Sequence, residues 1–126
     1  MSREAANRFI EALWRLEEDR DVEPLIEVHA EDCRVSNVAV PRTFGHEGLR
    51  EFWTSYRNTF YEMKSEFRNV FADKAGHAAL EWTTEGTTSG DTVYYEGAST
   101  LEIEGDKVKR FMAYFDPRNL TERVVD

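Results

Sequence analysis

The sequence has few of the residues that cross-link a chain, ligate metals or interrupt regular structure: one cysteine, three histidines, three prolines and seven glycines among 126 residues. A single cysteine, Cys33, excludes an internal disulfide and any cysteine-rich zinc site. Basic residues are also scarce, because 16 Lys and Arg stand against 25 Asp and Glu, a formal net charge of −9 that repels phosphate backbones and anionic lipid. We therefore expect neither nucleic acid nor a membrane surface as a partner.

Long hydrophobic runs are absent as well. No stretch approaches the roughly 18 apolar residues of a membrane span, and the N-terminal stretch MSREAANRFIEALW contains acids and no small-residue cleavage site. The sequence also has no Gly-rich phosphate loop, and its histidines, His29, His46 and His77, lack the spacing of metal ligands. We expect a cytoplasmic protein that uses no metal and no organic cofactor.

The chain does contain enough apolar material for one folded core. Hydrophobic residues make up 40% of the sequence, and its aromatic residues are three Trp, five Tyr and eight Phe. A folded chain of this length buries about two thirds of its unfolded surface. We interpret residues 1–126 as a single domain, with no room for a second.

The first half of the sequence has helical periodicity. Residues 3–19 are predicted to form an amphipathic helix, because its large apolar residues recur at three-to-four spacing, and its acidic residues are expected on a solvated face. Asp21 is expected to cap a short second helix that ends near His29. A β-like run follows over residues 33–38, and residues 46–61 have the clearest helical pattern.

After residue 63 the period changes from about 3.6 to 2, which indicates strands. Turn signals separate four of them, expected over residues 64–73, 77–87, 92–104 and 107–115. Loops of hairpin length favour an antiparallel meander. Helices followed by strands, without a repeat or a linker, predict an α+β fold in which three N-terminal helices pack on one face of a curved, mostly antiparallel sheet.

Strand alternation indicates which residues face the helices. In the strand over residues 77–87, Leu80, Trp82 and Thr84 share the face expected to meet the helices. In the last strand both faces are apolar, with Phe111, Ala113 and Phe115 on one and Val108, Arg110, Met112 and Tyr114 on the other. A sheet with two apolar faces needs two covers, so we predict a homodimer through the outer face of the sheet.

Three stretches, together with the order helix, helix, strand, helix, four strands, carry a family resemblance: Gly45-His46-Glu47-Gly48-Leu49-Arg50-Glu51-Phe52-Trp53, Leu80-Glu81-Trp82, and Glu104-Gly105-Asp106-Lys107-Val108 followed by Tyr114-Phe115-Asp116. Nearly the whole chain resembles the SnoaL-like branch of the nuclear-transport-factor-2-like (NTF2-like) superfamily, which includes polyketide cyclases, ketosteroid isomerases and limonene epoxide hydrolases. The resemblance implies a cone-shaped fold with a pocket between sheet and helices, in which different members perform different chemistry.

The resemblance transfers little of the known chemistry to individual residues. Asn37 falls where steroid isomerases have an aspartate base and limonene epoxide hydrolases have an asparagine that helps hold the attacking water. An amide takes no proton at neutral pH, so the isomerase base is missing. The isomerase's oxyanion-hole tyrosine would fall near Leu13 or Trp14, and its neutral acid near Ser99. The arginine and two aspartates of the epoxide hydrolase would fall on Trp82, Thr84 and Ala113.

The residues predicted to line the pocket are Trp14, Asn37, Trp53, Tyr56, Phe60, Trp82, Thr84, Tyr95, Ser99, Phe111 and Phe115. Aromatic residues at this spacing are also what an ordinary core contains. Asn37 is the one candidate catalytic residue, and its alternative role is a strand-end amide bonded to backbone. Thr84 and Ser99 either donate to a ligand or bond to their neighbours.

Other polar residues have simpler explanations. Asp116, followed by Pro117, is typical of the N-cap of a short C-terminal helix. The three histidines are expected at the surface, although His29 and Asp32 could meet at the mouth of the pocket. Cys33 has no base partner and is expected to pack as a small apolar residue.

The leading hypothesis is a protein that binds a small hydrophobic or cyclic molecule in an aromatic-lined pocket, as a cofactor-independent isomerase, cyclase or hydrolase. One alternative is a non-catalytic ligand-binding or sensing protein, which the loss of acid/base groups at the matched positions favours. The other is a dimeric protein-interaction module.

Overall fold

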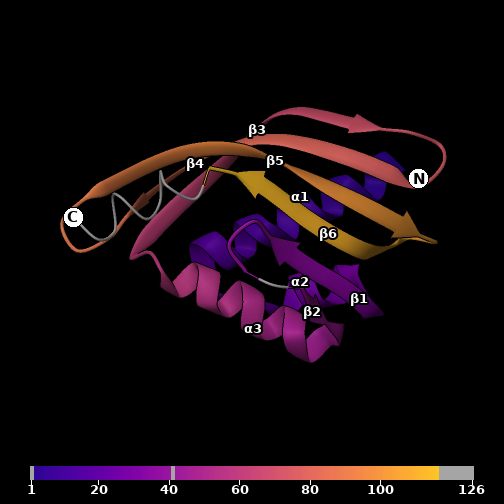
Figure 1. The fold of residues 1–126 in the computed structure, drawn as a ribbon, viewed down its shortest axis with the longest axis horizontal. Helices are drawn as coiled ribbons and strands as arrows, with labels where there is room; N and C mark the ends of the chain where they lie inside the picture. The colour runs from indigo at the N-terminus through magenta and orange to yellow at the C-terminus, as the bar shows by residue number, and fades with distance from the viewer. Residues whose placement is uncertain (1, 41, 117–126) are drawn as a thin grey trace.

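The computed structural model describes residues 2–40 and 42–116. Its helices are α1 (Ser2–Asp19), α2 (Glu23–Val28) and α3 (Gly45–Asn58), and its strands are β1 (His29–Asn37), β2 (Thr43–Phe44), β3 (Glu62–Ala72), β4 (His77–Thr87), β5 (Thr92–Glu104) and β6 (Lys107–Phe115). The strands form one six-stranded sheet in the order β2-β1-β6-β5-β4-β3. The long strands curve over the helices, which lie on one side of the sheet (Figure 1).

The four long strands form the predicted antiparallel meander, β3 to β6. Strand β1 extends the sheet in parallel to β6, and the short β2 pairs antiparallel to β1. The predicted α+β class, three helices on a mostly antiparallel curved sheet, is confirmed. None of the helices in the described ranges is long and apolar enough to cross a membrane.

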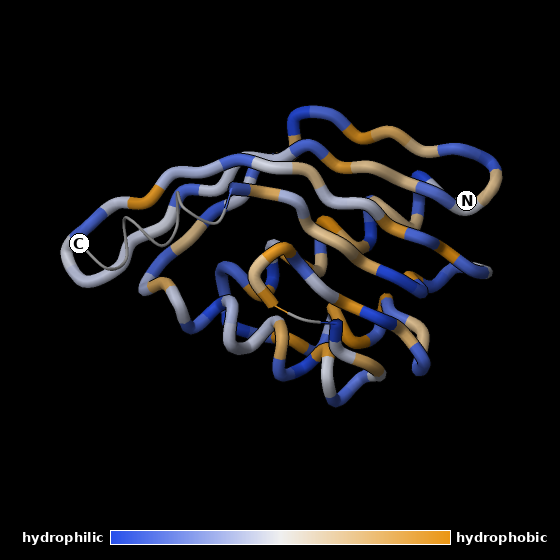
Figure 2. The backbone as a smooth tube through the Cα atoms, in the orientation of Figure 1, coloured by the Kyte–Doolittle hydropathy of each residue, from blue (hydrophilic) through white to orange (hydrophobic). Residues whose placement is uncertain are grey.

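Helix α1 carries the apolar stripe that joins the helices to the sheet. Its alanines and large aliphatic residues favour a helix, and Phe9, Leu13 and Leu16 are buried at three-to-four spacing. Hydrophobic and hydrophilic residues alternate along the helices and strands (Figure 2), as expected where each element buries one face. Glu17 lies on this buried stripe, one turn after Leu13, and is only 2% exposed. The expectation that the acids of this helix are all solvated is therefore wrong at Glu17.

Several element ends differ from the prediction. Strand β1 begins at His29, directly after α2, rather than at residue 33, and β2 was not predicted because two residues are too short to show a period. The N-cap of α2 is Val22, although the Asp21 carboxylate still accepts a hydrogen bond from the Glu23 N–H at 3.1 Å. Helix α3 ends at Asn58, so Phe60 lies beyond it. The helix predicted after Asp116 lies outside the described residues.

The outer face of β6 has one apolar residue fewer than the alternation of the sequence predicted. Its pairing with β5 shifts register between Glu102 and Ile103, which breaks the simple alternation. Val108 is fully buried, whereas it was expected on the outer face with Met112 and Tyr114. The register shift therefore moves one apolar residue from the outer face into the core.

Candidate functional site

A cavity of about 40 Å³ lies between the helices and the sheet, which is room for a few water molecules. Its wall is mostly aromatic and is contributed by α1 and α3 together with five strands. The wall residues are Phe9, Leu13, Asn37, Phe52, Trp53, Tyr56, Ser65, Phe67, Trp82, Thr84, Ser99, Phe111, Ala113 and Phe115.

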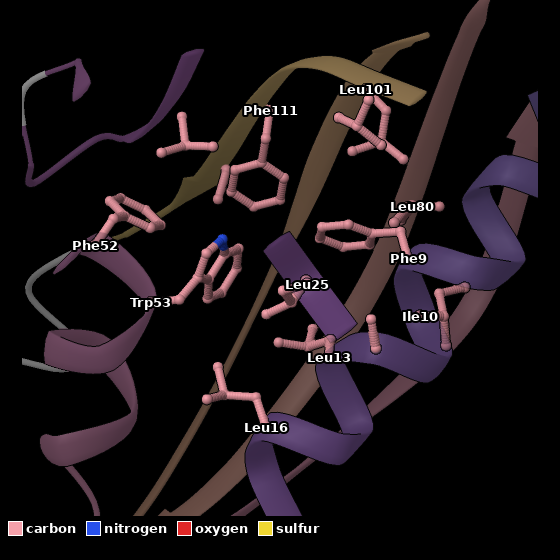
Figure 3. Packing of buried hydrophobic residues seen from close by; sticks show 14 of the residues in the cluster. Phe9, Ile10, Leu13, Leu16, Leu25, Phe52, Trp53, Leu80, Leu101 and Phe111 are labelled. Carbon is pink, nitrogen blue, oxygen red and sulfur yellow. The ribbon is translucent and has the colours of Figure 1, made fainter. Parts of the chain in front are cut away.

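Aromatic rings from α1, α3 and β6 meet at one side of this cavity (Figure 3). The ring centroids of Trp53 and Phe111 are 5.1 Å apart, those of Phe52 and Trp53 are also 5.1 Å apart, and those of Phe9 and Phe111 are 5.3 Å apart. Trp53 is 4% exposed, and its indole N–H has no acceptor among the described residues. A buried donor without a partner costs free energy that an incoming acceptor would recover.

A wider groove adjoins the cavity on the side of β1 and α3. Its volume is about 380 Å³, and its wall includes Ala39, Val40, Thr43, Glu51, Ser55 and Thr59. Asn37, Phe52, Tyr56 and Phe115 belong to both the groove and the cavity. These four residues therefore form the boundary between the inner cavity and the surface.

Two of the predicted polar groups are already bonded within the protein. The Asn37 Oδ1 accepts hydrogen bonds from the backbone N–H groups of Ala39 at 2.8 Å and Val40 at 2.7 Å, which is the alternative role considered for it. The Trp82 indole N–H donates to the Ser99 hydroxyl at 2.9 Å. Asn37 thus serves first as a cap for the turn after β1, and Ser99 holds Trp82 in the wall.

The inner polar end of the cavity depends on Glu17. The Ser65 hydroxyl donates to Glu17 Oε2 at 2.5 Å, and the Ser65 N–H donates to Glu17 Oε1 at 2.9 Å. The hydroxyls of Ser65 and Thr84 are 2.7 Å apart. The hydroxyls of Tyr56 and Tyr95 bond to each other, and Tyr95 lies opposite Thr84 in the pairing of β4 with β5. Glu17, Ser65 and Thr84 therefore form one buried hydrogen-bonded network, and the two tyrosine hydroxyls form a second bonded pair.

Burial determines the electrostatics of this network. Loss of hydration raises the pKa of Glu17, although the two bonds from Ser65 and the charges of Lys64 and Arg57 oppose the rise. Burial likewise raises the pKa of both Tyr56 and Tyr95, so these phenols stay neutral at physiological pH. Glu17 is thus the carboxyl group of the network, and its burial makes it harder to ionise than a glutamate in water.

The structure places the predicted pocket residues in two groups. Asn37, Trp53, Tyr56, Trp82, Thr84, Ser99, Phe111 and Phe115 are in the cavity wall. Tyr95 lies behind the wall, Phe60 packs against Tyr56, and Trp14 packs on Phe67 with its N–H donating to the Ser65 carbonyl at 2.9 Å. The wall residues absent from the prediction are Phe9, Leu13, Phe52, Ser65, Phe67 and Ala113.

Glu17 was also missed, and the sequence held a signal for it. It follows Leu13 by four residues, on the apolar side of an otherwise regular amphipathic helix. A charged residue on that side is unusual because ionised carboxylates are rarely buried without a partner.

The expectations for the histidines need one correction. His29 is 2% exposed rather than at the surface. Its Nδ1–H donates to the Leu25 carbonyl at 2.7 Å, and Asp32 instead accepts from Lys109 Nζ at 2.6 Å, so His29 and Asp32 do not meet. Cys33 is fully buried, as an apolar packing role requires. Within residues 2–40 and 42–116, no group of three or more His, Cys, Asp or Glu side chains could hold a metal ion.

Solved structures share this fold at low sequence identity. An NTF2-like protein of unknown function from Burkholderia pseudomallei is 15% identical with a TM-score of 0.87, over 99% of this chain and 98% of its own. TerC, co-crystallised with polyporic acid, is 18% identical with a TM-score of 0.84, over 99% and 98%. An LEH-like epoxide hydrolase from M. tuberculosis is 18% identical with a TM-score of 0.73, over 98% and 89%. Likeness at these identities shows the fold alone.

No curated protein matches this chain. The sequence profile of the SnoaL-like domain, in contrast, matches residues 6–111, from the first buried turn of α1 to the middle of β6. That range includes all the cavity residues except Ala113 and Phe115. The chain belongs to the SnoaL-like domain family.

Proposed function

We propose that this protein binds a small, ring-containing molecule with an oxygen acceptor in the aromatic cavity. The observation that carries the proposal is the unpartnered Trp53 N–H in a buried aromatic wall. Apolar rings supply most of the contact area in ligand pockets, and a few polar groups orient the ligand. That TerC was co-crystallised with polyporic acid supports a small-molecule ligand for a fold of this kind.

The cavity as it stands is smaller than a ring, so the ligand is expected to enter from the groove. Phe52, Tyr56 and Phe115 belong to both spaces, and rotation of their side chains would join the two. The groove of about 380 Å³ has the volume of a small-molecule site. Closure over the ligand would then place its ring among the aromatic side chains of the wall.

Binding of this kind is common to a cofactor-independent isomerase, cyclase or hydrolase and to a non-catalytic ligand-binding or sensing protein. Glu17 favours the enzymes. A buried carboxyl group with a raised pKa, connected to hydroxyls in the cavity wall, is the group that acid/base chemistry requires. Asn37, whose acceptor oxygen is already bonded to backbone, is the weaker candidate.

The indole N–H signals in nitrogen-15 correlated NMR spectra test this proposal. Only three tryptophans are present, and in the protein Trp14 and Trp82 already donate to Ser65 and Ser99. Indanone, a bicyclic ring with one carbonyl, is expected to move the Trp53 N–H signal downfield, because the carbonyl becomes its acceptor. Indene, the same frame without oxygen, should bind without that downfield shift.

Two variants complete the test. Trp53→Phe should weaken indanone binding by about three- to tenfold, the usual effect of one lost hydrogen bond, and Trp14→Phe, outside the cavity, should leave it unchanged. If indanone and indene cause no saturable change at Trp53 or Trp82, the proposed cavity is not a ligand site.

We also propose the homodimer through the outer sheet face, which would suit an enzyme or an interaction module equally. Phe71 and Tyr114 on that face are 57% and 47% exposed, and Met112 lies beside them. The cytoplasmic location and the lack of nucleic-acid partners stay predictions from composition.

A further inference from the structure

The side-chain amide of Asn37 has a donor group whose direction is fixed. Its Oδ1 accepts hydrogen bonds from the backbone N–H groups of Ala39 at 2.8 Å and Val40 at 2.7 Å. Because both N–H groups need an acceptor, the oxygen faces the turn and the N–H₂ group lies on the other side of the amide. This N–H₂ group has no acceptor among residues 2–40 and 42–116. Asn37 is thus held in one orientation with its donors unused.

The unused donors lie where the cavity meets the groove. Asn37 is partly buried and belongs to the wall of both spaces. It pairs with Ala113 of β6, which is also in the cavity wall, and the side chains of paired residues share one face of a sheet. The amide is therefore accessible to a molecule that extends from the cavity into the groove.

The bonds to the turn make this amide a better donor. Hydrogen bonds that share one group polarise each other, so an amide whose oxygen accepts two bonds donates more strongly through its nitrogen. The turn also immobilises the side chain before any ligand arrives, so little side-chain entropy is lost on binding. Asn37 is therefore preorganised to donate to an acceptor on a ligand.

The other unpartnered donor, the indole N–H of Trp53, lies in a different part of the site. Trp53 is in the wall of the cavity but not in that of the groove, whereas Asn37 is in both. A ligand that extends from the cavity into the groove would therefore meet two donors at two positions along its length. Two separate donors match two separate oxygen atoms on the ligand.

The charges of the two walls favour neutral oxygens. Among the described residues, the cavity wall contains no Lys, Arg or His, and the groove wall contains Glu51 as its single charged residue. Glu17 lies directly behind Ser65 of the cavity wall. A ligand carboxylate would be buried here without a cation and close to two acids, which is unfavourable. Carbonyl oxygens carry no such cost.

We propose that Asn37 is a ligand-binding residue whose N–H₂ group selects neutral rings with a second carbonyl oxygen. Trp53 binds the first oxygen inside the cavity, and Asn37 binds the second at the junction with the groove. The preferred ligand is therefore a cyclic dicarbonyl compound, such as a cyclic dione or imide. This inference rests on the proposed ligand-binding function and narrows its ligand class.

Nitrogen-15 correlated NMR spectra of the full chain test the proposal. The sequence has five asparagines and no glutamine, so the side-chain N–H₂ signal that is missing from Asn37→Asp identifies Asn37. N-methylisoindolinone has one carbonyl and N-methylphthalimide has two, on the same bicyclic frame. Both probes are expected to move the Trp53 N–H signal downfield, whereas N-methylphthalimide alone should move the Asn37 N–H₂ signals downfield.

The variant Asn37→Asp removes the donor and retains the turn. Its carboxylate accepts the same two backbone N–H groups but has no proton to donate. In calorimetric titrations, the preference for N-methylphthalimide over N-methylisoindolinone should fall by about threefold or more. Asn58→Asp makes the same replacement at an exposed asparagine, whose Oδ1 accepts from Arg20 at 3.2 Å, and should retain the wild-type preference.

The NMR measurement on the wild-type protein decides the question even if Asn37→Asp does not fold, because the Asn37 signals can then be assigned through their coupling to the backbone. The inference is wrong, while the binding function stands, if both probes bind and N-methylphthalimide leaves the Asn37 signals in place. The same holds if both probes move these signals equally, or if Asn37→Asp keeps the wild-type preference. If neither probe causes a saturable change at Trp53 or Trp82, the proposed function fails and this inference fails with it.

Discussion

His29 is a buried titratable side chain with a direct effect on stability. Its Nδ1–H donates to the Leu25 carbonyl, its ring meets Phe9 edge-on at 5.9 Å, and Nε2 has no partner within the described residues. Burial lowers the pKa of His29 to about 4, and proximity to His46 adds to this. Protonation would place an uncompensated charge in the core.

We predict that stability falls as pH drops through this range. The pKa of His29 in the folded protein is below the ordinary value of 6.5, so the unfolded chain binds the proton first as pH falls. The stabilisation that comes from keeping His29 neutral is therefore complete above about pH 6.5 and is lost as pH falls through about 4. The slope is about 1.4 kcal/mol of unfolding free energy per pH unit between these values. Urea denaturation over a pH series measures it.

A matched pair of variants identifies the group responsible. His29→Asn retains an N–H for Leu25 and cannot be protonated, so its profile should lack this slope. His77→Asn, at an exposed histidine that bonds Asp73, should retain it. Equal slopes in the wild-type protein and His29→Asn would assign the effect to other groups.

At the scale of single residues, the sequence predicts which side of a helix is buried, but it does not predict which distant residue a buried side chain bonds to. The spacing of Phe9, Leu13 and Leu16 predicts which side of α1 is buried, and Glu17 falls on that side. Its partner Ser65 is 48 residues away, on β3. Only the fold brings the two together, so a carboxylate expected in solvent became the centre of the buried network.

At the scale of elements, Arg57 of α3 bonds to the end of α1 and to the segment that leads from α3 into β3. It is 4% exposed. Its guanidinium donates to the carbonyls of Glu17 at 3.0 Å, Phe60 at 2.8 Å and Tyr61 at 3.2 Å. Carbonyls at helix ends lack intrahelical partners, and this planar group supplies several donors at once.

Arg57→Lys is therefore expected to destabilise the protein although it keeps the charge. A single ammonium cannot reproduce the fork, so buried carbonyls lose donors, at a cost of about 2 kcal/mol or more in unfolding free energy. Chemical denaturation gives the difference. Arg15→Lys, at an exposed arginine paired with Asp19 and Asp21, should change it by well under about 1 kcal/mol. Similar losses in both variants would contradict the role of Arg57.

Among elements, the long ones were predictable. Strands β3 to β6 show a two-residue period between turn signals, and their meander follows from short loops. Strand β1 pairs in parallel with β6, which is more than 70 residues later, and nothing local encodes that choice. The cavity depends on this pairing, because it places Asn37 beside Ala113 in the wall.

At the scale of the whole molecule, the sheet has a second face that the helices do not cover. Register aligns Phe71 with Ala79, Ala79 with Thr100 and Thr100 with Met112 across that face, and Tyr114 lies one pair further along β6. Ion pairs between Arg68 and Glu96 and between Arg110 and Glu102 flank this row. An apolar centre with a polar rim is the usual anatomy of a protein interface.

We predict that the protein elutes as a dimer, with a mass by light scattering of about twice 14.7 kDa at micromolar concentration. Tyr114→Glu puts a charge in the centre of the proposed interface, where a copy of the same charge would face it, and should shift the mass to that of one chain. Tyr61→Glu is the matched control, because Tyr61 is 64% exposed but precedes β3 away from that face. A wild-type mass of about 15 kDa would exclude the dimer, and a dimer that survives Tyr114→Glu but not Tyr61→Glu would move the interface to the other end of the sheet.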